Sequence, residues 1–235
     1  QIPLQNRYGC GYVYCDEFQT YDDSLKELKN KLRQDIEPIK HIKFDCGRYE
    51  STWYKNIVSI GLSSHFLEPL QATSIHIAIF TATNLILHSL KSKECISNYA
   101  NVRGFNRRIN VVIDDYKDLL QMHYLAGRQD TPFWKFIKNE IHISDANRDI
   151  IEISKHRLLN NLDVSTEHGT GGWGVWSHIF DNAGLFDKDM IKKELYRLKK
   201  LNDGDVQLNS MSSYYTNKLK LELLSAGEMF KYLKL

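Results

Sequence analysis

The residues best suited to chemistry lie where an apolar stretch ends at a glycine and a long apolar helix begins. Residues 53–60 are typical of a strand, Gly61 follows, and a short loop leads through Pro69 to a helix start at Gln71. Glycine lets a ligand approach the backbone closely. The first N–H groups of a helix, here from Gln71 to Ser74, lack partners within the helix and attract an anion. The segment therefore indicates a cofactor beside the loop and a small anion at the helix start, with an ordinary strand-to-helix turn as the alternative.

The elements that must position this segment change in character along the chain. Residues 1–62 are strand-rich, with β-prone runs at 12–14, 39–44 and 53–60. No Gly or Pro occurs between Leu70 and Asn101, and the length of this apolar stretch favours one helix over residues 71–92. Further helices are predicted near residues 25–32, 109–125, 132–141, 145–159, 188–201 and 211–235.

The predicted fold class is mixed α+β. Residues 1–65 form a β-containing segment, and residues 66–235 form a mostly α-helical region. A strand-rich piece of this size would leave edges and faces exposed if it stood alone. We therefore expect it to complete a sheet whose other strands lie upstream of Gln1.

Residues 53–75 closely resemble a segment of the flavin-dependent halogenases of the tryptophan halogenase type. The resemblance is carried above all by the run Phe66-Leu67-Glu68-Pro69-Leu70 and the residues that follow it. Two further matches occur in the same order along the chain. They comprise Ile2, Pro3, Leu4, Arg7, Gly9, Gly11, Tyr12, Val13 and Tyr14, and then Tyr124, Arg128, Asp130, Thr131, Pro132, Phe133 and Trp134.

The resemblance implies a fold like that of flavin monooxygenases, with a helical substrate subdomain. It also implies that the dinucleotide-binding loop and the catalytic lysine of the family lie upstream of Gln1. In such enzymes reduced FAD, supplied by a separate flavin reductase, reacts with oxygen to a flavin hydroperoxide. Halide attacks the hydroperoxide to give hypohalous acid, which halogenates an electron-rich aromatic substrate. A related flavin monooxygenase that hydroxylates, or an inactive relative, is the alternative.

Individual roles follow from the resemblance position by position. Gly61, Leu62, Pro69 and Ile75 are expected to contact or shape the FAD site. The backbone N–H groups of Thr73 and Ser74 are expected to bind the halide. The family usually has a catalytic glutamate where this chain has Gln71. An amide keeps the hydrogen-bonding capacity of that position but loses its charge and basicity.

The substrate side is indicated by three residues after a glycine-rich loop. Trp173, Trp176 and His178 lie where tryptophan halogenases have residues that contact the substrate. Packing of these aromatic rings in the core is the alternative. We expect an indole, a phenol or another electron-rich aromatic compound as substrate.

The overall composition excludes several other classes of function. The chain has 31 basic and 29 acidic residues, so its net charge of +2 gives no electrostatic reason for a nucleic-acid partner. The four cysteines form no C-x-x-C pair, and neither they nor the histidines show metal-ligand spacing, so we expect no metal site and a reducing, cytoplasmic setting. The apolar run 75–90 contains polar residues such as His76 and Asn84, and we interpret it as a buried helix, with no membrane partner. The oligomeric state, a homodimer among the options, stays open.

Overall fold

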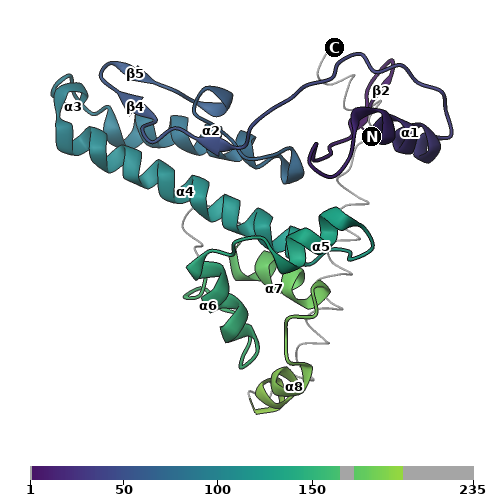
Figure 1. Ribbon diagram of the computed structural model, residues 1–235. Coiled ribbons are helices and arrows are strands. Elements are labelled where there is room, and N and C mark those ends of the chain that lie inside the picture. The colour runs from purple at the N-terminus through teal and green to yellow at the C-terminus, as the bar shows by residue number, and fades with distance from the viewer. Residues whose placement is uncertain (1, 165–171, 198–235) are drawn as a thin grey trace.

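The computed structural model describes residues 2–164 and 172–197. Its longest helix, α4 (Tyr99–Leu125), has other described elements on both of its sides (Figure 1). Helix α2 and the hairpin of β4 and β5 lie along one side of α4, and helices α6 and α7 lie along the other (Figure 1). The remaining helices are α1 (Tyr21–Leu32), α2 (Thr73–Asn84), α3 (Glu94–Ser97), α5 (Pro132–Asn139), α6 (Asp145–Ser154), α7 (Gly172–Asn182) and α8 (Lys188–Arg197).

The described strands are two residues long and pair as three antiparallel ladders. Ile2 lies opposite Gly9, Gly47 opposite Phe66, and Trp53 opposite Val58. The paired strands are β1 (Ile2–Pro3) with β2 (Tyr8–Gly9), β3 (Gly47–Arg48) with β6 (His65–Phe66), and β4 (Trp53–Tyr54) with β5 (Ile57–Val58). The mixed fold class is thereby confirmed at its coarse level.

The prediction of one continuous strand over residues 53–60 is wrong. The run folds back on itself as a hairpin, because Lys55 adopts a left-handed conformation with φ 55° and the indole N–H of Trp53 donates to the Lys55 carbonyl at 2.9 Å. The β-prone runs at 12–14 and 39–44 form no strand either. Alternation of apolar residues is not sufficient, because a strand also needs a neighbour that satisfies its backbone hydrogen bonds.

The helix predicted over residues 71–92 is present but is not regular. It consists of the 3₁₀ turn η2 (Leu70–Ala72), the α-helix α2 and the π turn η3 (Leu85–Ser89). Gln71 and Ala72 both have left-handed backbone angles, with φ 58° and 52°. The helix therefore starts with an abrupt change of direction that periodicity does not reveal.

The prediction that this helix is buried is wrong for its outer face. Ile75 and Ile79 expose 64% and 62% of their surface, and Ile86 and Leu87 are exposed as well. The span Leu70–Ser89, with a mean hydropathy of 1.4, is long and apolar enough to cross a membrane by length and composition, although core helices of soluble proteins share these properties. Within the described chain, the inner face packs on α4 and the outer face has no covering element.

Capping residues define the starts of the other helices. Asn98 caps α4 through a bond from the N–H of Asn101 at 2.9 Å, so this helix starts ten residues before the predicted 109. Pro132 opens α5 behind Thr131, and Ser144 caps α6 at the N–H of Asn147, so both helices start at the predicted positions 132 and 145. Helix α6 ends at Ser154 rather than at 159. The helix predicted over 211–235 lies outside the described residues.

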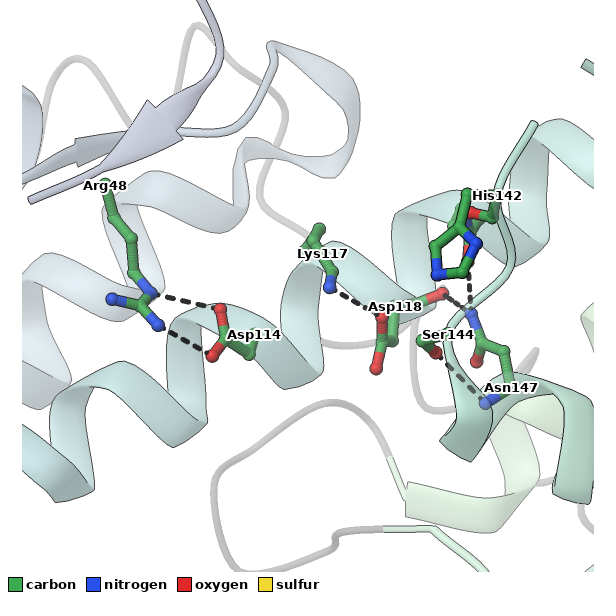
Figure 2. Close-up of polar contacts among 8 residues, drawn as sticks. Arg48, Asp114, Lys117, Asp118, His142, Ser144 and Asn147 are labelled. Carbon is green, nitrogen blue, oxygen red and sulfur yellow. Dashed lines mark hydrogen bonds and ion pairs between the residues drawn. The ribbon is translucent and has the colours of Figure 1, made fainter. Parts of the chain in front are cut away.

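A row of polar residues on α4 holds the segment that leads to β4. Asn106 accepts from the backbone N–H of Trp53 at 2.7 Å and donates to its carbonyl at 2.8 Å. Asn110 donates to the carbonyl of Glu50 at 2.9 Å. Asp114 accepts two bonds from Arg48, at 3.0 and 2.9 Å (Figure 2). Because residues four apart share one face of a helix, the three residues lie in line and fix the course of the preceding chain.

A second polar cluster fixes α6 to α4. The side-chain amide of Asn147 donates to the Asp118 carbonyl at 3.1 Å and to Gln121 at 2.9 Å (Figure 2). Gln121 donates in turn to the carbonyl of His142 at 2.7 Å. Asn147 is completely buried, so its amide hydrogens need these partners.

The apolar core surrounds α4 on both sides. The helix contributes eight buried residues: Phe105, Ile109, Val112, Ile113, Tyr116, Leu119, Leu120 and Met122. Trp53 from β4 packs edge-on against Phe105, with ring centroids 5.4 Å apart. On the other side Trp176 and Phe180 of α7 belong to the same cluster.

Candidate functional site

The candidate site begins at the turn that follows β5. Gly61 opens a 3₁₀ turn, η1 (Gly61–Ser63), with φ 66°, a conformation that favours glycine. The backbone N–H of Ile60 donates to the Ser63 hydroxyl at 3.0 Å, which tightens the turn. Leu62 projects outward and exposes 75% of its surface. The turn thus presents an open backbone and an apolar side chain to whatever lies beside it.

His65 lies buried directly after this turn. Its Nδ1 is 2.9 Å from the hydroxyl of Ser64, while its Nε2 is buried and has no protein partner in the described chain. Burial lowers the pKa of His65, so the ring favours its neutral form. It therefore offers one unused ring nitrogen on the inner side of the segment.

Glu68 is held by a tyrosine from α4. The Tyr124 hydroxyl donates to Oε2 of Glu68, whereas Oε1 is buried without a partner among the residues described. Burial raises the pKa of Glu68, against the opposing effects of the Tyr124 bond and of the nearby His123. Burial and the carboxylate also raise the pKa of Tyr124. The pair anchors the loop to the helix at a partly buried position.

Gln71 is directed toward α4 by its unusual backbone. The two consecutive left-handed residues, Gln71 and Ala72, are not glycine, so each costs on the order of 1 kcal/mol. The Nε2 atom of Gln71 lies 2.6 Å from Nε2 of His123. This contact joins the start of α2 to α4 at the position where the sequence resemblance expects a carboxylate.

The start of α2 has unused hydrogen-bond donors. Ala72 is the N-cap residue, and its side chain makes no capping bond. The hydroxyls of Thr73 and Ser74 are buried and have no partner in the part of the chain that the structure describes. Together with the backbone N–H groups at the helix start, they form a candidate site for a small anion.

Seven of the predicted site residues belong to this one segment. Gly61 lies close to α2, since a Cβ built on it would be 3.8 Å from the Cβ of Ala78. The segment contains Gly61, Leu62, Pro69, Gln71, Thr73, Ser74 and Ile75. The structure therefore packs the glycine turn against α2, near Ala78.

The three predicted substrate residues lie elsewhere. Trp173, Trp176 and His178 are on α7, on the opposite side of α4 from α2 (Figure 1). Trp173 exposes 45% of its surface, whereas Trp176 is 3% exposed and packs near Phe180 with centroids 6.3 Å apart. The described structure does not bring these residues together with Gln71.

A cavity of about 190 Å³ lies beside Trp176, between α4, α6 and α7. Its lining includes Asp118, Asn147 and Asp163, and the indole nitrogen of Trp176 is buried without a partner within the described ranges. Asp163 is engaged by Arg157, with contacts at 2.5 and 2.6 Å. Oδ1 of Asp118 lies 3.2 Å from Nζ of Lys117 (Figure 2). The cavity has both polar and apolar lining residues, and α4 separates it from the Gly61 segment.

Two residues that the sequence analysis did not assign contribute to the candidate site. His123 contacts Gln71 across 52 positions of sequence, and Tyr124 contacts Glu68 across 56 positions. Tyr124 lies within a stretch that resembles the family, which was the available signal for it. His123 had no such signal, because its partner is known only once α4 packs beside the start of α2.

Metal coordination finds no support within residues 2–164 and 172–197. These residues contain no group of three or more His, Cys, Asp or Glu side chains placed to hold a metal ion. Cys10, Cys15, Cys46 and Cys95 are free thiols.

The family model described as tryptophan halogenase matches residues 1–190 of this chain. The tryptophan 6-halogenase of Streptomyces albogriseolus is 36% identical over 220 residues, which cover 88% of this chain and 41% of that protein. The tryptophan 7-halogenase of Lentzea aerocolonigenes is 35% identical over 170 residues, which cover 71% of this chain and 31% of that protein.

A solved structure shows the same relation. The tryptophan C-6 flavin-dependent halogenase (chlorinase) from taromycin biosynthesis has a TM-score of 0.79 and 25% identity. The match covers 100% of this chain and 46% of that one. The chain thus spans less than half the length of these relatives.

Proposed function

The chain belongs to the tryptophan halogenase family, and we propose that it is part of a flavin-dependent halogenase that acts on an electron-rich aromatic substrate. The observation that carries the proposal is the segment from Gly61 to Ile75. It combines a glycine turn, a helix start without a side-chain cap and two buried hydroxyls, at Thr73 and Ser74, that have no partner among the described residues. An anion site beside an open apolar turn is what a halide and a flavin would require.

The residues present fit an FAD molecule at this place. Leu62 and Ile75 project apolar side chains outward from the two ends of the segment, and Gly61 leaves its backbone accessible. These residues would hold one side of the flavin, and Pro69 would shape the loop. When bound, the flavin supplies the oxidising power that converts a halide into hypohalous acid.

The N–H groups of Thr73 and Ser74 would hold the halide close to the flavin. The positive end of the α2 dipole favours an anion there, and the missing side-chain cap leaves the site open. Binding by the backbone explains why the site does not depend on a basic side chain.

The halogenation step releases water as its second product. The carbon–halogen bond forms, the aromatic carbon–hydrogen and the halogen–oxygen bonds break, and the released proton combines with the hydroxide to give water. Gln71 has no basicity to take up the proton, but its carbonyl oxygen can stabilise positive charge on the ring. We therefore infer a slower reaction than a carboxylate at this position would support.

Several features of the whole enzyme follow from the family only as proposals. These are the remainder of the FAD site with its lysine, supplied by the portion of the family that this chain does not span, and reduction of the flavin by a separate reductase. Three further features are also proposals. They are a division of the chain at residues 65 and 66, a helical substrate subdomain of a flavin-monooxygenase-like fold, and substrate contacts by Trp173, Trp176 and His178. A cytoplasmic location and a homodimer stay predictions.

The halide site can be tested in the full-length protein that contains this chain, with FAD, a flavin reductase and NADH. Ser74→Pro removes one backbone N–H at a position in the first helical turn, where proline is tolerated. We expect the KM for halide to rise about tenfold or more with little change in FAD affinity. Ser74→Ala removes the hydroxyl and keeps the N–H, so it measures the side-chain contribution separately, and we expect it to raise the halide KM less than Ser74→Pro does.

Product analysis decides between the candidate functions. Halogenated product from an indole and phenol panel in chloride, bromide or iodide supports the proposal. Gln71 favours one alternative, a related hydroxylase, which predicts oxygen insertion that does not depend on halide. A protein that neither binds FAD nor forms either product would be an inactive relative.

A further inference from the structure

The contacts of His123 with Gln71 and Leu119 indicate which nitrogen of its ring carries a hydrogen. Nε2 of His123 lies 2.6 Å from Nε2 of Gln71, and Nδ1 of His123 lies 2.9 Å from the carbonyl oxygen of Leu119. A carbonyl oxygen can only accept a hydrogen bond, so Nδ1 carries a hydrogen. In the neutral ring Nε2 is therefore the bare nitrogen, and it accepts from the side-chain amide of Gln71.

This tautomer decides how the Gln71 carboxamide is oriented. With its NH2 group bound to His123, the carbonyl oxygen points away from the ring and remains free to accept a hydrogen bond or to face a positive charge. When His123 is protonated, Nε2 becomes a donor and binds best to the carbonyl oxygen. The carboxamide then turns, and the NH2 group takes the outward position.

The backbone conformation at Gln71 supports a functional role for its contact with His123. Gln71 and Ala72 are consecutive left-handed residues without the freedom of glycine, and strain of this kind persists where the surrounding structure maintains it. The next residue, Thr73, is the first of α2 and is buried. The side chain of Gln71 is thus fixed immediately before the proposed halide site.

We propose that His123 is a positioning residue that, in its neutral form, presents the Gln71 carbonyl oxygen to the reaction site. The inference rests on the proposed function. A carbonyl oxygen stabilises the positive charge that develops on an aromatic ring as the carbon–halogen bond forms, whereas an NH2 group opposes it. Halogenation then depends on the protonation of an imidazole rather than of a carboxylate.

A charged group from the loop before α2 faces His123. Glu68 interacts electrostatically with His123, and Tyr124 on α4 donates to Glu68. Glu68 and Tyr124 are therefore left unmutated in the kinetic test of His123.

Kinetics of the full-length protein test the proposal first. We expect kcat for halogenation to fall at acid pH, because a protonated His123 turns the Gln71 carbonyl oxygen away from the reaction site. His123→Phe should lower kcat about tenfold at pH 8 and abolish this limb, with the halide KM unchanged. His156→Phe, at an exposed histidine just after α6, is the control and should leave both kcat and the limb unchanged. A limb that persists in His123→Phe overturns the proposal.

A double-mutant comparison separates positioning from a general structural effect. Gln71→Glu provides two equivalent oxygens that need no orientation, so we expect faster halogenation. In that background His123→Phe should change kcat by no more than about twofold. An equal loss in both backgrounds shows that His123 does not act through Gln71. Absence of halogenated product from the unmutated protein would instead sink the proposed function.

The tautomer can be measured without any turnover. Nitrogen NMR of protein labelled at histidine should show His123 above pH 8 with its hydrogen on Nδ1, and Gln71→Leu should shift the Nε2 signal. A hydrogen on Nε2 at that pH contradicts the proposal. Because the tautomer is measured in the unmutated protein and Gln71→Leu only identifies the signal, the result remains decisive even if His123→Phe does not fold.

Discussion

Glu68 and Tyr124 show how much a single buried contact contributes at the scale of the residue. The Tyr124 hydroxyl donates a hydrogen bond to Oε2 of Glu68, whereas Oε1 accepts no hydrogen bond from the described part of the chain. Burial raises the pKa of Glu68, so the folded state binds a proton more readily than the unfolded state does. The carboxyl group therefore costs stability as pH rises from the unfolded pKa through the folded one.

Tyr124→Phe should increase the loss of folding stability that the charged Glu68 causes at higher pH. Without the hydroxyl donor the Glu68 carboxylate loses a bond to a charged group, about 1.5 to 3 kcal/mol. The folded-state pKa of Glu68 then rises further, so the loss is small near pH 4 and grows toward pH 8. Unfolding in urea at several pH values measures it. Tyr196→Phe, at an exposed tyrosine on α8, is the matched control. A loss that does not vary with pH would show that Glu68 is not the group affected.

At the scale of the element, α4 determines the arrangement of everything around it. Polar residues on one of its faces fix the chain before β4, and Asp118 and Gln121 fix α6. His123 and Tyr124, one turn later, reach the loop and the start of α2. The helix therefore has two roles, since it forms the core and also positions the Gly61 segment.

Asn106→Ala tests the first of these roles. Both backbone groups of the buried Trp53 lose their partner, so we expect about 1 to 3 kcal/mol of lost stability. Thermal unfolding measures the loss. Asn139→Ala, at the exposed end of α5, should be nearly neutral. Equal effects of the two substitutions would contradict the role given to Asn106.

The turn between α4 and α5 is equally constrained. A Cβ at Gly127 would lie 2.7 Å from Cζ3 of Trp134 and 2.9 Å from the carbonyl oxygen of Tyr124. Gly127→Ala should therefore destabilise the protein by about 1 to 3 kcal/mol through overpacking. The matched control is Gly104→Ala, since Gly104 lies in α4 with open space around its Cβ position and should gain helix propensity. A stable Gly127→Ala variant would mean that Trp134 can move aside.

At the scale of the whole molecule, the outer face of α2 is the most telling surface. Ile75, Ile79, Ile86 and Leu87 are exposed along one helix, and the chain spans 41% of the length of its relative from Streptomyces albogriseolus. An apolar surface of this kind usually marks an interface. We infer that it is covered in the complete enzyme by the portion that this chain does not span.

Ile79→Asp should therefore have opposite consequences in two contexts. In the 235-residue chain alone it should reduce binding of an apolar dye and self-association, because it breaks the exposed patch. In the full-length protein it should lower the melting temperature, because it places a charge in an interface. Ile39→Asp, at an exposed isoleucine in a loop, is the control. The same response in both contexts would show that the face is not covered.

Catalysis by the isolated chain makes a separate prediction at the same scale. The 235 residues contain one side of the proposed flavin site, so we expect weak FAD binding and no halogenation by them alone. Spectral titration with FAD and product analysis measure both. Robust turnover by the isolated chain would contradict the view that the site is shared with the unspanned portion.

The sequence by itself determined which residue types lie in the local segment and in what order, and so the chemistry that is predicted for it. Gly61, the run from Phe66 to Leu70 and the helix start at Thr73 and Ser74 are neighbours along the chain, so their types and spacing could be interpreted directly. The start of a helix near residues 144 and 145 was predicted from the sequence in the same way, because a cap acts on the next three residues.

Only the tertiary structure decided which distant residues meet. The hairpin at Lys55, the left-handed backbone at Gln71 and the contact with His123 depend on packing against α4, which lies far away in sequence. Packing of α2 and α7 on opposite sides of α4 (Figure 1) likewise separates Trp176 from Gln71. Periodicity reports which face of an element is apolar, whereas the partner of that face is set by the energy of the whole packed core.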